Sequence, residues 1–156
     1  MPTQRESQQR EKVLAYITHG PRLLVLRQPD LPEAGLQVPG GTVEAGELPA
    51  AAVLREAWEE TGLAGLALVG LLGERTFDMR PYGHAETHHR WFYHLRCAGA
   101  VPATWRHFER TPSDGAPGPI SFDFSWVALT GGMPPLIAEM GALLPELIAS
   151  MELRWP

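Results

Sequence analysis

The strongest constraint on the fold is one segment, residues 41–63, which reads GTVEAGELPAAAVLREAWEETGL. Most residues in its second half, 49–61, are strong helix formers. Pro49 suits the first helical turn, and Gly62 suits the position just beyond the last turn. The segment therefore predicts a helix over 49–61, preceded by a loop and by the glycine pair Gly40-Gly41.

Three glutamates share one face of this predicted helix. At about 100° per residue, Glu60 lies roughly 40° and Glu59 roughly −60° from Glu56, so the carboxylates fall within an arc of about 100°. Like charges this close repel one another. Carboxylate oxygens on a rigid helix suit Mg²⁺ or Mn²⁺, and a carbonyl of the Gly40-Gly41 turn could complete the ligand shell. For the three glutamates alone, a solvated acidic face without function is the alternative.

The loop before the predicted helix carries a charge that complements the helix. Glu47 and Arg55 have the lengths and charges to form an ion pair, which would tie the loop to the helix. Cations held by the glutamates would also attract phosphate oxygens. This chemistry offers a route by which an acidic protein could bind a polyphosphate.

Composition indicates a single folded domain and excludes some classes of binding partner. The chain has 156 residues, of which 44% are hydrophobic and 20% are charged, which suits a single folded domain. We expect a flexible start over residues 1–12 and one domain over residues 13–156. The formal charge of −5 argues against a general duplex-DNA binder and against binding to anionic membranes.

The termini and the single cysteine narrow the class further. The first dozen residues are polar and do not resemble a signal peptide, and no run of about 18 apolar residues follows. We therefore expect a soluble, cytoplasmic protein that does not enter a membrane. Because Cys97 is the only cysteine, an intrachain disulfide and a multi-cysteine zinc site are excluded, and Cys97 is expected in the core.

Several other segments indicate strands around the helix. Residues 13–18 and 23–26 predict a β-hairpin, and residues 67–72, 90–97 and 122–129 predict further strands. Apolar residues recur at helical spacing over 136–151, and this stripe predicts a second helix docked on the sheet, with a dimer contact as the alternative. Residues 112–119 predict a surface loop. Helices on a mixed sheet place the chain in the α/β (or α+β) class.

The segment 41–63 resembles the Nudix box, GX5EX7REUXEEXGU, in which U is an aliphatic residue. Ala57 and Leu63 fill the two aliphatic places. All seven fixed places are also filled, by Gly41, Glu47, Arg55, Glu56, Glu59, Glu60 and Gly62. Seven fixed residues at fixed spacing are a far more specific signal than a four-residue motif.

The resemblance implies a Nudix-type α/β/α sandwich around a mixed β-sheet, and hydrolysis of a nucleoside diphosphate linked to a moiety X. By motif position it makes Glu56, Glu59 and Glu60 both catalytic and metal-binding, with the Gly40 carbonyl as a further ligand of Mg²⁺ or Mn²⁺. It also implies that Glu56 orients or deprotonates the attacking water. Structural roles are implied for the remaining box residues, which are Gly41, Glu47, Arg55 and Gly62.

The expected partner is a small nucleotide or nucleoside diphosphate derivative, and a homodimer is a further expectation because many relatives are dimers. Two alternatives remain on the same fold, namely a non-catalytic nucleotide-sensing or partner-binding module and a diphosphate isomerase. Pro81 and Tyr82 lie near the positions where ADP-ribose hydrolases place a proline and dinucleoside polyphosphate hydrolases place a tyrosine. They are hints to the substrate, which the box itself does not specify.

A further acid or base outside the box is expected, since catalysis in the family often uses one. Glu86, Glu109 and Asp114 are the candidates, and each is also read as an ordinary exposed acid. Residues 84–89 (HAETHH) resemble the start of a zinc deaminase signature, but that signature needs two further cysteines. In a strand, His84, Glu86 and His88 would instead face one side together.

Overall fold

Strand β1 (Gln8–His19) organises the fold because three other strands pair with it. It runs parallel to β5 (Glu86–Cys97), and it forms an antiparallel hairpin with β2 (Arg22–Arg27). Its middle residues, 12–14, also pair, antiparallel, with the short strand β3 (Gly40–Thr42). The parallel pair of β1 and β5 makes the sheet mixed.

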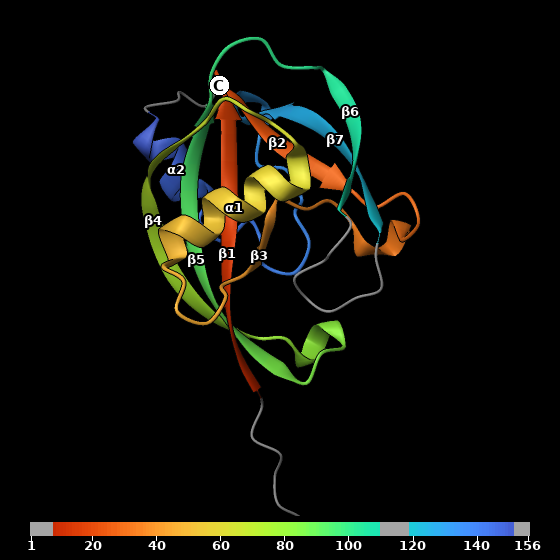
Figure 1. Ribbon diagram of the computed structural model, residues 1–156, viewed down its shortest axis with the longest axis vertical. Helices are drawn as coiled ribbons and strands as arrows, with labels where there is room; N and C mark the ends of the chain where they lie inside the picture. The colour runs from red at the N-terminus through yellow and green to blue at the C-terminus, as the bar shows by residue number, and fades with distance from the viewer. Residues whose placement is uncertain (1–7, 110–118, 152–156) are drawn as a thin grey trace, which may run out of the picture.

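The computed structural model describes residues 8–109 and 119–151, and these form one seven-stranded sheet (Figure 1). The strand order is β4-β5-β1-β2-β7-β6, with β3 beside β1. Strands β4 (Leu66–Asp78) and β6 (Thr104–Glu109) are the two edges, and β7 (Ile120–Ala128) lies between β2 and β6. Short 3₁₀ helices cover Pro32–Ala34, Arg80–Tyr82 and Leu129–Gly131.

Each face of the sheet is covered by one α-helix, α1 (Pro49–Thr61) in front of the sheet and α2 (Leu144–Ser150) behind it (Figure 1). Alternate residues of β1 therefore enter two separate cores. Val13, Ala15 and Ile17 pack with buried residues of α1. Leu14 and Tyr16 pack with buried residues of α2. The α/β/α sandwich expected from the sequence is confirmed.

Strands β1 and β2 separate soon after their hairpin, and this separation creates the site. Cα pairing between them is limited to Thr18 with Leu23 and His19 with Arg22. Further along β2, Leu26 forms a bridge with Gln37 instead. The segment leading into β3 thus lies between the two strands and carries Gly40 to the middle of the sheet.

The structure corrects two expectations about the ends of the chain. Residues 8–12, expected in a flexible start, belong to β1 and pair with residues 86–90 of β5; residues 1–7 lie outside the described residues. The helix expected over 136–151 begins only at Leu144. Ala138 and Glu139 adopt left-handed backbone angles, and Pro145 has no N–H to extend a helix from earlier residues.

The sequence also missed two strands, β3 and β6, and shortened β4 by several residues. Most of the loop expected over 112–119 lies outside the described residues. Neither described α-helix has the length and apolar character needed to cross a lipid bilayer.

Candidate functional site

Helix α1 carries the site and has the bounds that the sequence predicts. Pro49 occupies its first turn, and Gly62 ends it in the left-handed conformation at φ 72°, donating its N–H to the Trp58 carbonyl. On the side of α1 that faces the sheet, Gly41 of β3 lies against Glu56. A Cβ atom on Gly41 would lie 2.2 Å from the Glu56 Cδ, so only glycine allows this contact.

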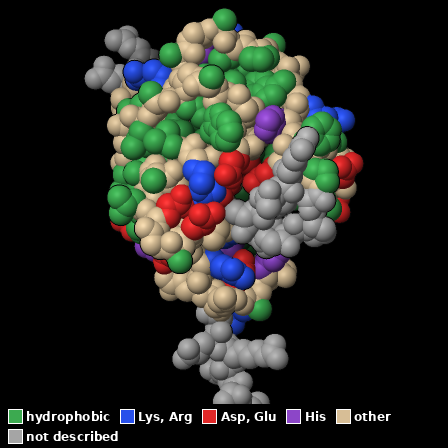
Figure 2. Space-filling model, viewed as in Figure 1, with side chains coloured by type: hydrophobic (Ala, Val, Ile, Leu, Met, Phe, Trp, Pro, Cys, Tyr) green, Lys and Arg blue, Asp and Glu red, His purple; other side chains and the backbone are tan. Residues whose placement is uncertain are grey.

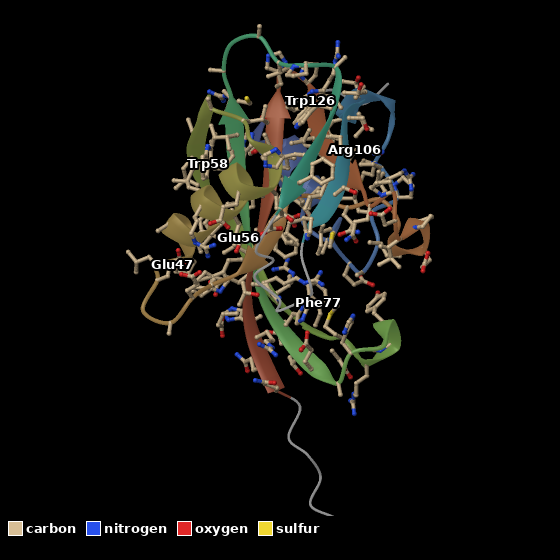
Figure 3. All side chains as sticks on the ribbon, turned by 45° about the vertical axis from the view of Figure 1, so that its right-hand side comes forward. Glu47, Glu56, Trp58, Phe77, Arg106 and Trp126 are labelled. Atoms are coloured by element: carbon tan, nitrogen blue, oxygen red, sulfur yellow. The ribbon has the colours of Figure 1, made fainter. Side chains whose placement is uncertain are left out.

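Three carboxylates from two distant segments meet beside this glycine. Glu56 and Glu59 come from α1, and Glu109 comes from the end of β6. One oxygen of each lies within 4.8 Å of the others. Glu56 is 1% exposed and Glu109 is 7% exposed, so these carboxylates are largely withdrawn from water. Figure 3 shows Glu56 between the helix and the sheet, and Figure 2 shows acidic side chains gathered on this face of the molecule.

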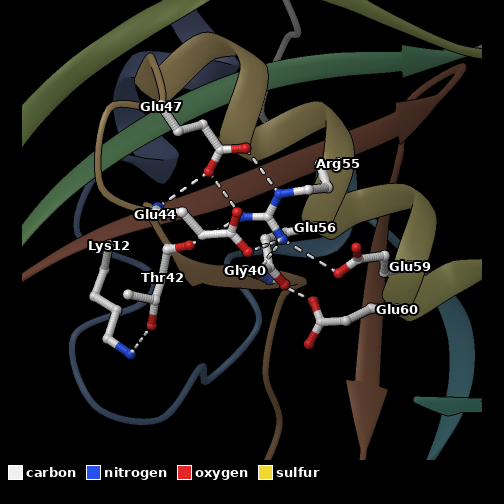
Figure 4. Close-up of polar contacts among 9 residues, drawn as sticks. All are labelled: Lys12, Gly40, Thr42, Glu44, Glu47, Arg55, Glu56, Glu59 and Glu60. Atoms are coloured by element: carbon white, nitrogen blue, oxygen red, sulfur yellow. Dashed lines mark hydrogen bonds and ion pairs between the residues drawn. The ribbon is translucent and has the colours of Figure 1, made fainter. Parts of the chain in front are cut away.

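Glu60 extends the same group of charges into the interior. Its Oε2 accepts a hydrogen bond from the Gly40 N–H at 2.7 Å (Figure 4). Burial raises the pKa of Glu60 well above its usual value, and Glu109 raises that pKa further. The Gly40 N–H opposes this shift, whereas Glu56 and Glu59 add to it. The fold therefore concentrates negative charge where little water can screen it.

This donor set fits a divalent cation. Glu56, Glu59 and Glu109 supply hard carboxylate oxygens from rigid elements, which is the ligand type that Mg²⁺ and Mn²⁺ prefer. A cation would also offset the repulsion that raises the pKa of Glu60. Gly40 contacts this group of carboxylates through its N–H, which donates to Glu60. That its carbonyl is a metal ligand stays a prediction.

Arg55 links the loop before α1 to the carboxylates of the helix. Its guanidinium donates to both oxygens of Glu47, each at 2.8 Å, and to Glu56 Oε1 at 2.8 Å (Figure 4). It also contacts Glu59 at 3.2 Å and the Thr42 carbonyl at 3.1 Å. Hydrogen bonding from Arg55 lowers the pKa of Glu47 to about 2. The ion pair predicted between Glu47 and Arg55 is confirmed.

Among the described residues, one of the other candidate acids, Glu86, lies elsewhere. Glu86 accepts from Arg10 at 3.3 Å and contacts His88 at 2.6 Å, away from the three carboxylates. Asp114 lies outside the described residues. Of the two described candidates, Glu109 is the one that the fold brings to the box, and its burial separates it from an ordinary exposed acid. Cys97 is buried in the core, as expected.

A cavity of about 210 Å³ opens beside these groups, where β1 and β2 separate. Glu60 and Glu109 line it on the side of α1, and Lys12 and Arg90 also line it. The sequence did not single out these two basic residues. They become neighbours only through the parallel pairing of β1 with β5, which joins segments almost 80 residues apart.

Comparison with known proteins adds a family to this geometry. A family model described as NUDIX domain matches residues 8–130. The chain is similar to a solved MutT NUDIX hydrolase from Burkholderia pseudomallei, with 26% identity and a TM-score of 0.59, over 90% of this chain and 99% of that one. No curated protein matches.

Two other solved structures share the fold at lower identity. One is a UDP-X diphosphatase, with 18% identity and a TM-score of 0.64, over 99% of this chain and 68% of that one. The other is an ADP-ribose pyrophosphatase from Streptococcus suis, with 18% identity and a TM-score of 0.60, over 94% of this chain and 96% of that one.

Proposed function

The chain belongs to the Nudix family of pyrophosphohydrolases, and on this premise we propose that it cleaves the pyrophosphate linkage of a nucleoside diphosphate derivative with Mg²⁺ or Mn²⁺. One observation carries the proposal: Glu109, from a separate strand, meets Glu56 and Glu59 of the intact box within 4.8 Å. A surface acidic face without function would not need a third, buried carboxylate.

In this proposal Glu56, Glu59 and Glu109 hold the cation, and Glu60 adds negative charge beside it. When bound, a divalent cation supplies Lewis-acid polarisation of phosphoryl oxygens and lowers the pKa of water. Glu56 orients the attacking water or accepts its proton, since it is the most buried of the carboxylates in the group.

Arg55 and Glu60 act by holding the other groups in place. Arg55 fixes the Glu56 carboxylate through Oε1, while its two bonds to Glu47 fix the guanidinium. Glu60 fixes the Gly40 backbone, which lines the same cavity. Such fixed groups need little rearrangement as charge develops on the leaving phosphate.

The substrate class is supported by the structures that share the fold. Their names include a UDP-X diphosphatase and an ADP-ribose pyrophosphatase, so both name a nucleoside diphosphate derivative. We extend this class, and not either compound, to the present chain.

A hydrolysis assay tests the proposal. The full chain is incubated with MgCl₂ and a panel of nucleoside diphosphate sugars, nucleoside triphosphates and dinucleoside polyphosphates in isotopically labelled water. Mass analysis of the products identifies the attacked phosphorus. We expect hydrolysis that EDTA abolishes and that added Mg²⁺ restores. Tight nucleotide binding without turnover of any substrate would favour the non-catalytic module instead.

Two substitutions make the assay specific to the site. Glu56→Gln and Glu109→Gln keep the side-chain shape and remove one charge, and each should lower kcat by about 10²-fold or more. Glu146→Gln, on the exposed side of α2, is the matched control and should retain full activity. Full activity of Glu109→Gln would exclude its proposed place in the site.

A further inference from the structure

The cavity beside the carboxylates has a second, positively charged side. Lys12 of β1 and Arg90 of β5 are register partners in the parallel pair, so their side chains leave the same face of the sheet on strands about 4.8 Å apart. Both line the cavity that also contains Glu60 and Glu109. We call Lys12 and Arg90 the cationic pair.

Arg90 is unusual among the basic residues because it is only 3% exposed. Its guanidinium donates to the Ala138 carbonyl, contacts the Met79 sulfur at 3.5 Å and lies 5.0 Å from the centre of the Phe77 ring. Within residues 8–109 and 119–151 it forms no ion pair with a carboxylate. Glu139 acts on Arg90 electrostatically but forms no ion pair with it. Burying a charge that lacks an ion-pair partner is costly, and a guanidinium has five N–H donors.

Lys12 shows how the pair is held toward the site. Its Nζ donates to the Thr42 hydroxyl at 2.8 Å (Figure 4), so the ammonium lies beside β3, next to the glycines that contact Glu56 and Glu60. Lys12 also lines a larger adjoining cavity of about 720 Å³, whereas Arg90 lines only the smaller one. Lys12 therefore lies where the smaller cavity meets the larger one, and Arg90 lies within the smaller one.

We propose that the cationic pair binds a phosphate group of the substrate, separate from the linkage held at the carboxylates. The inference rests on the proposed function and narrows it. The preferred moiety X is itself a phosphate, as in a nucleoside triphosphate, or carries one, as in a phosphorylated sugar, and is not a neutral sugar. Arg and Lys together offer the fixed fork and the point charge that commonly bind phosphate.

Metal-free binding tests the pair without any contribution from catalysis. Inorganic tripolyphosphate is titrated into the isotopically labelled full chain in EDTA, and amide resonances are followed by NMR. We expect saturable shifts centred on residues 10–14 and 88–92. Lys12→Met should weaken binding about tenfold, and Arg90→Lys should weaken it as well. Arg75→Met is the matched control, because Arg75 is an exposed register partner of Arg90 that lines neither cavity.

Three results would overturn the inference: no saturable binding, variants of the pair that bind like Arg75→Met, or citrate binding as tightly as tripolyphosphate. Lys12→Met keeps the test valid if the Arg90 variant does not fold. The hydrolysis assay above separates the two proposals. Hydrolysis without tripolyphosphate binding would remove the phosphate subsite alone, and binding without hydrolysis would remove the proposed function alone.

In hydrolysis, the cationic pair should favour substrates whose moiety X is or carries a phosphate. Lys12→Met should lower kcat/KM about tenfold for a nucleoside triphosphate, and by less than about threefold for a nucleoside diphosphate linked to a neutral sugar. An equal loss on both substrates would mean that Lys12 does not read the phosphate.

Discussion

Glu60 is the residue at which stability and activity oppose each other most directly. Its carboxylate is buried among three others, and its pKa is raised first by that burial and then by Glu109. In the unfolded chain the same group has a pKa near 4.5. A raised pKa in the folded state means that this group favours folding fully below about pH 4.5, and that its contribution is lost as the pH rises through the folded value.

Glu60→Gln should therefore stabilise the metal-free protein while it removes activity. In EDTA at pH 8 we expect a higher free energy of unfolding than for the wild type, and a shallower loss of stability between pH 5 and pH 8. The glutamine oxygen can still accept the Gly40 N–H. With Mg²⁺ present, kcat should fall by about 10²-fold, because the glutamine lacks the negative charge that Glu60 adds beside the proposed cation. Urea unfolding and the hydrolysis assay measure the two effects, and an active variant or an unchanged pH slope would contradict the assignment.

At the scale of residues, the sequence predicts the carboxylates of one helix but not the residues that the fold places beside them. Glu56, Glu59 and Glu60 could be grouped because helical periodicity is a local property. Glu109 could be named as a candidate but not placed, since β6 was not predicted and its pairing with β7 is long-range. Lys12 and Arg90 carried no local signal at all, because the parallel pairing that joins them is invisible in either segment alone.

At the scale of elements, the contact between β3 and α1 determines where the carboxylates lie. Gly41→Ala introduces a methyl group 2.2 Å from the Glu56 Cδ, so the Glu56 side chain must move. We expect a loss of stability of about 1–3 kcal/mol and a fall in kcat on the order of 10²-fold. Gly70→Ala in β4 is the control, because a Cβ there meets nothing within 4 Å. Thermal unfolding and the hydrolysis assay compare the two, and similar behaviour of both variants would refute the steric argument.

The ion pair of Glu47 with Arg55 ties the loop before α1 to the helix. Its contribution to stability depends on pH in the opposite direction to that of Glu60. Arg55 lowers the pKa of Glu47 from 4.5 to about 2. A lowered pKa means that the pair stabilises the fold above about pH 4.5 and that this contribution is lost as the pH falls through about 2. Glu47→Gln should cost about 1–3 kcal/mol at pH 7 and only a small part of that at pH 2, where the pH reaches the folded pKa of Glu47.

Urea unfolding from pH 7 to pH 2 measures this convergence. Glu33→Gln, in the exposed 3₁₀ helix Pro32–Ala34, is the control and should match the wild type throughout. A Glu47→Gln defect that persisted unchanged at pH 2 would mean that the side chain acts by packing and not by charge.

The elements that the sequence predicted best are those whose signals are local. Helix α1 was placed from Pro49 to Thr61 because proline, helix formers and a terminal glycine follow one another. The stripe over 136–151 misled because apolar residues at helical spacing also suit a loop that packs on a core. There, Pro145 and the left-handed Ala138 and Glu139 outweighed the periodicity.

At the scale of the whole molecule, the sandwich has two cores separated by one sheet. The Tyr16 hydroxyl of β1 links one of these cores to the wall of the site. Tyr16 lies in the core beneath α2, fully buried. Its hydroxyl donates to the Met140 carbonyl at 2.5 Å and accepts from the Leu143 N–H at 3.2 Å. Met140 lines the cavity that holds the carboxylates and the cationic pair. The chain leading into α2 is thus fixed to the centre of the sheet, and through Met140 it forms part of the wall of the cavity.

Tyr16→Phe should loosen this wall without disturbing the carboxylates. The substitution leaves a backbone carbonyl and an N–H buried without their partner, which should cost about 1–3 kcal/mol. Hydrogen exchange should become faster at Leu143 and neighbouring amides, and it should stay unchanged in α1. Tyr93→Phe is the matched control, because Tyr93 is also buried but its hydroxyl makes no hydrogen bond with the described residues. If both variants lost the same stability, packing of the ring and not the hydroxyl would account for the role of Tyr16. The sheet separates the core that contains Tyr16 from the core beneath α1. The substitution should therefore loosen the cavity wall and leave the carboxylates in place, so we expect it to raise KM more than it lowers kcat.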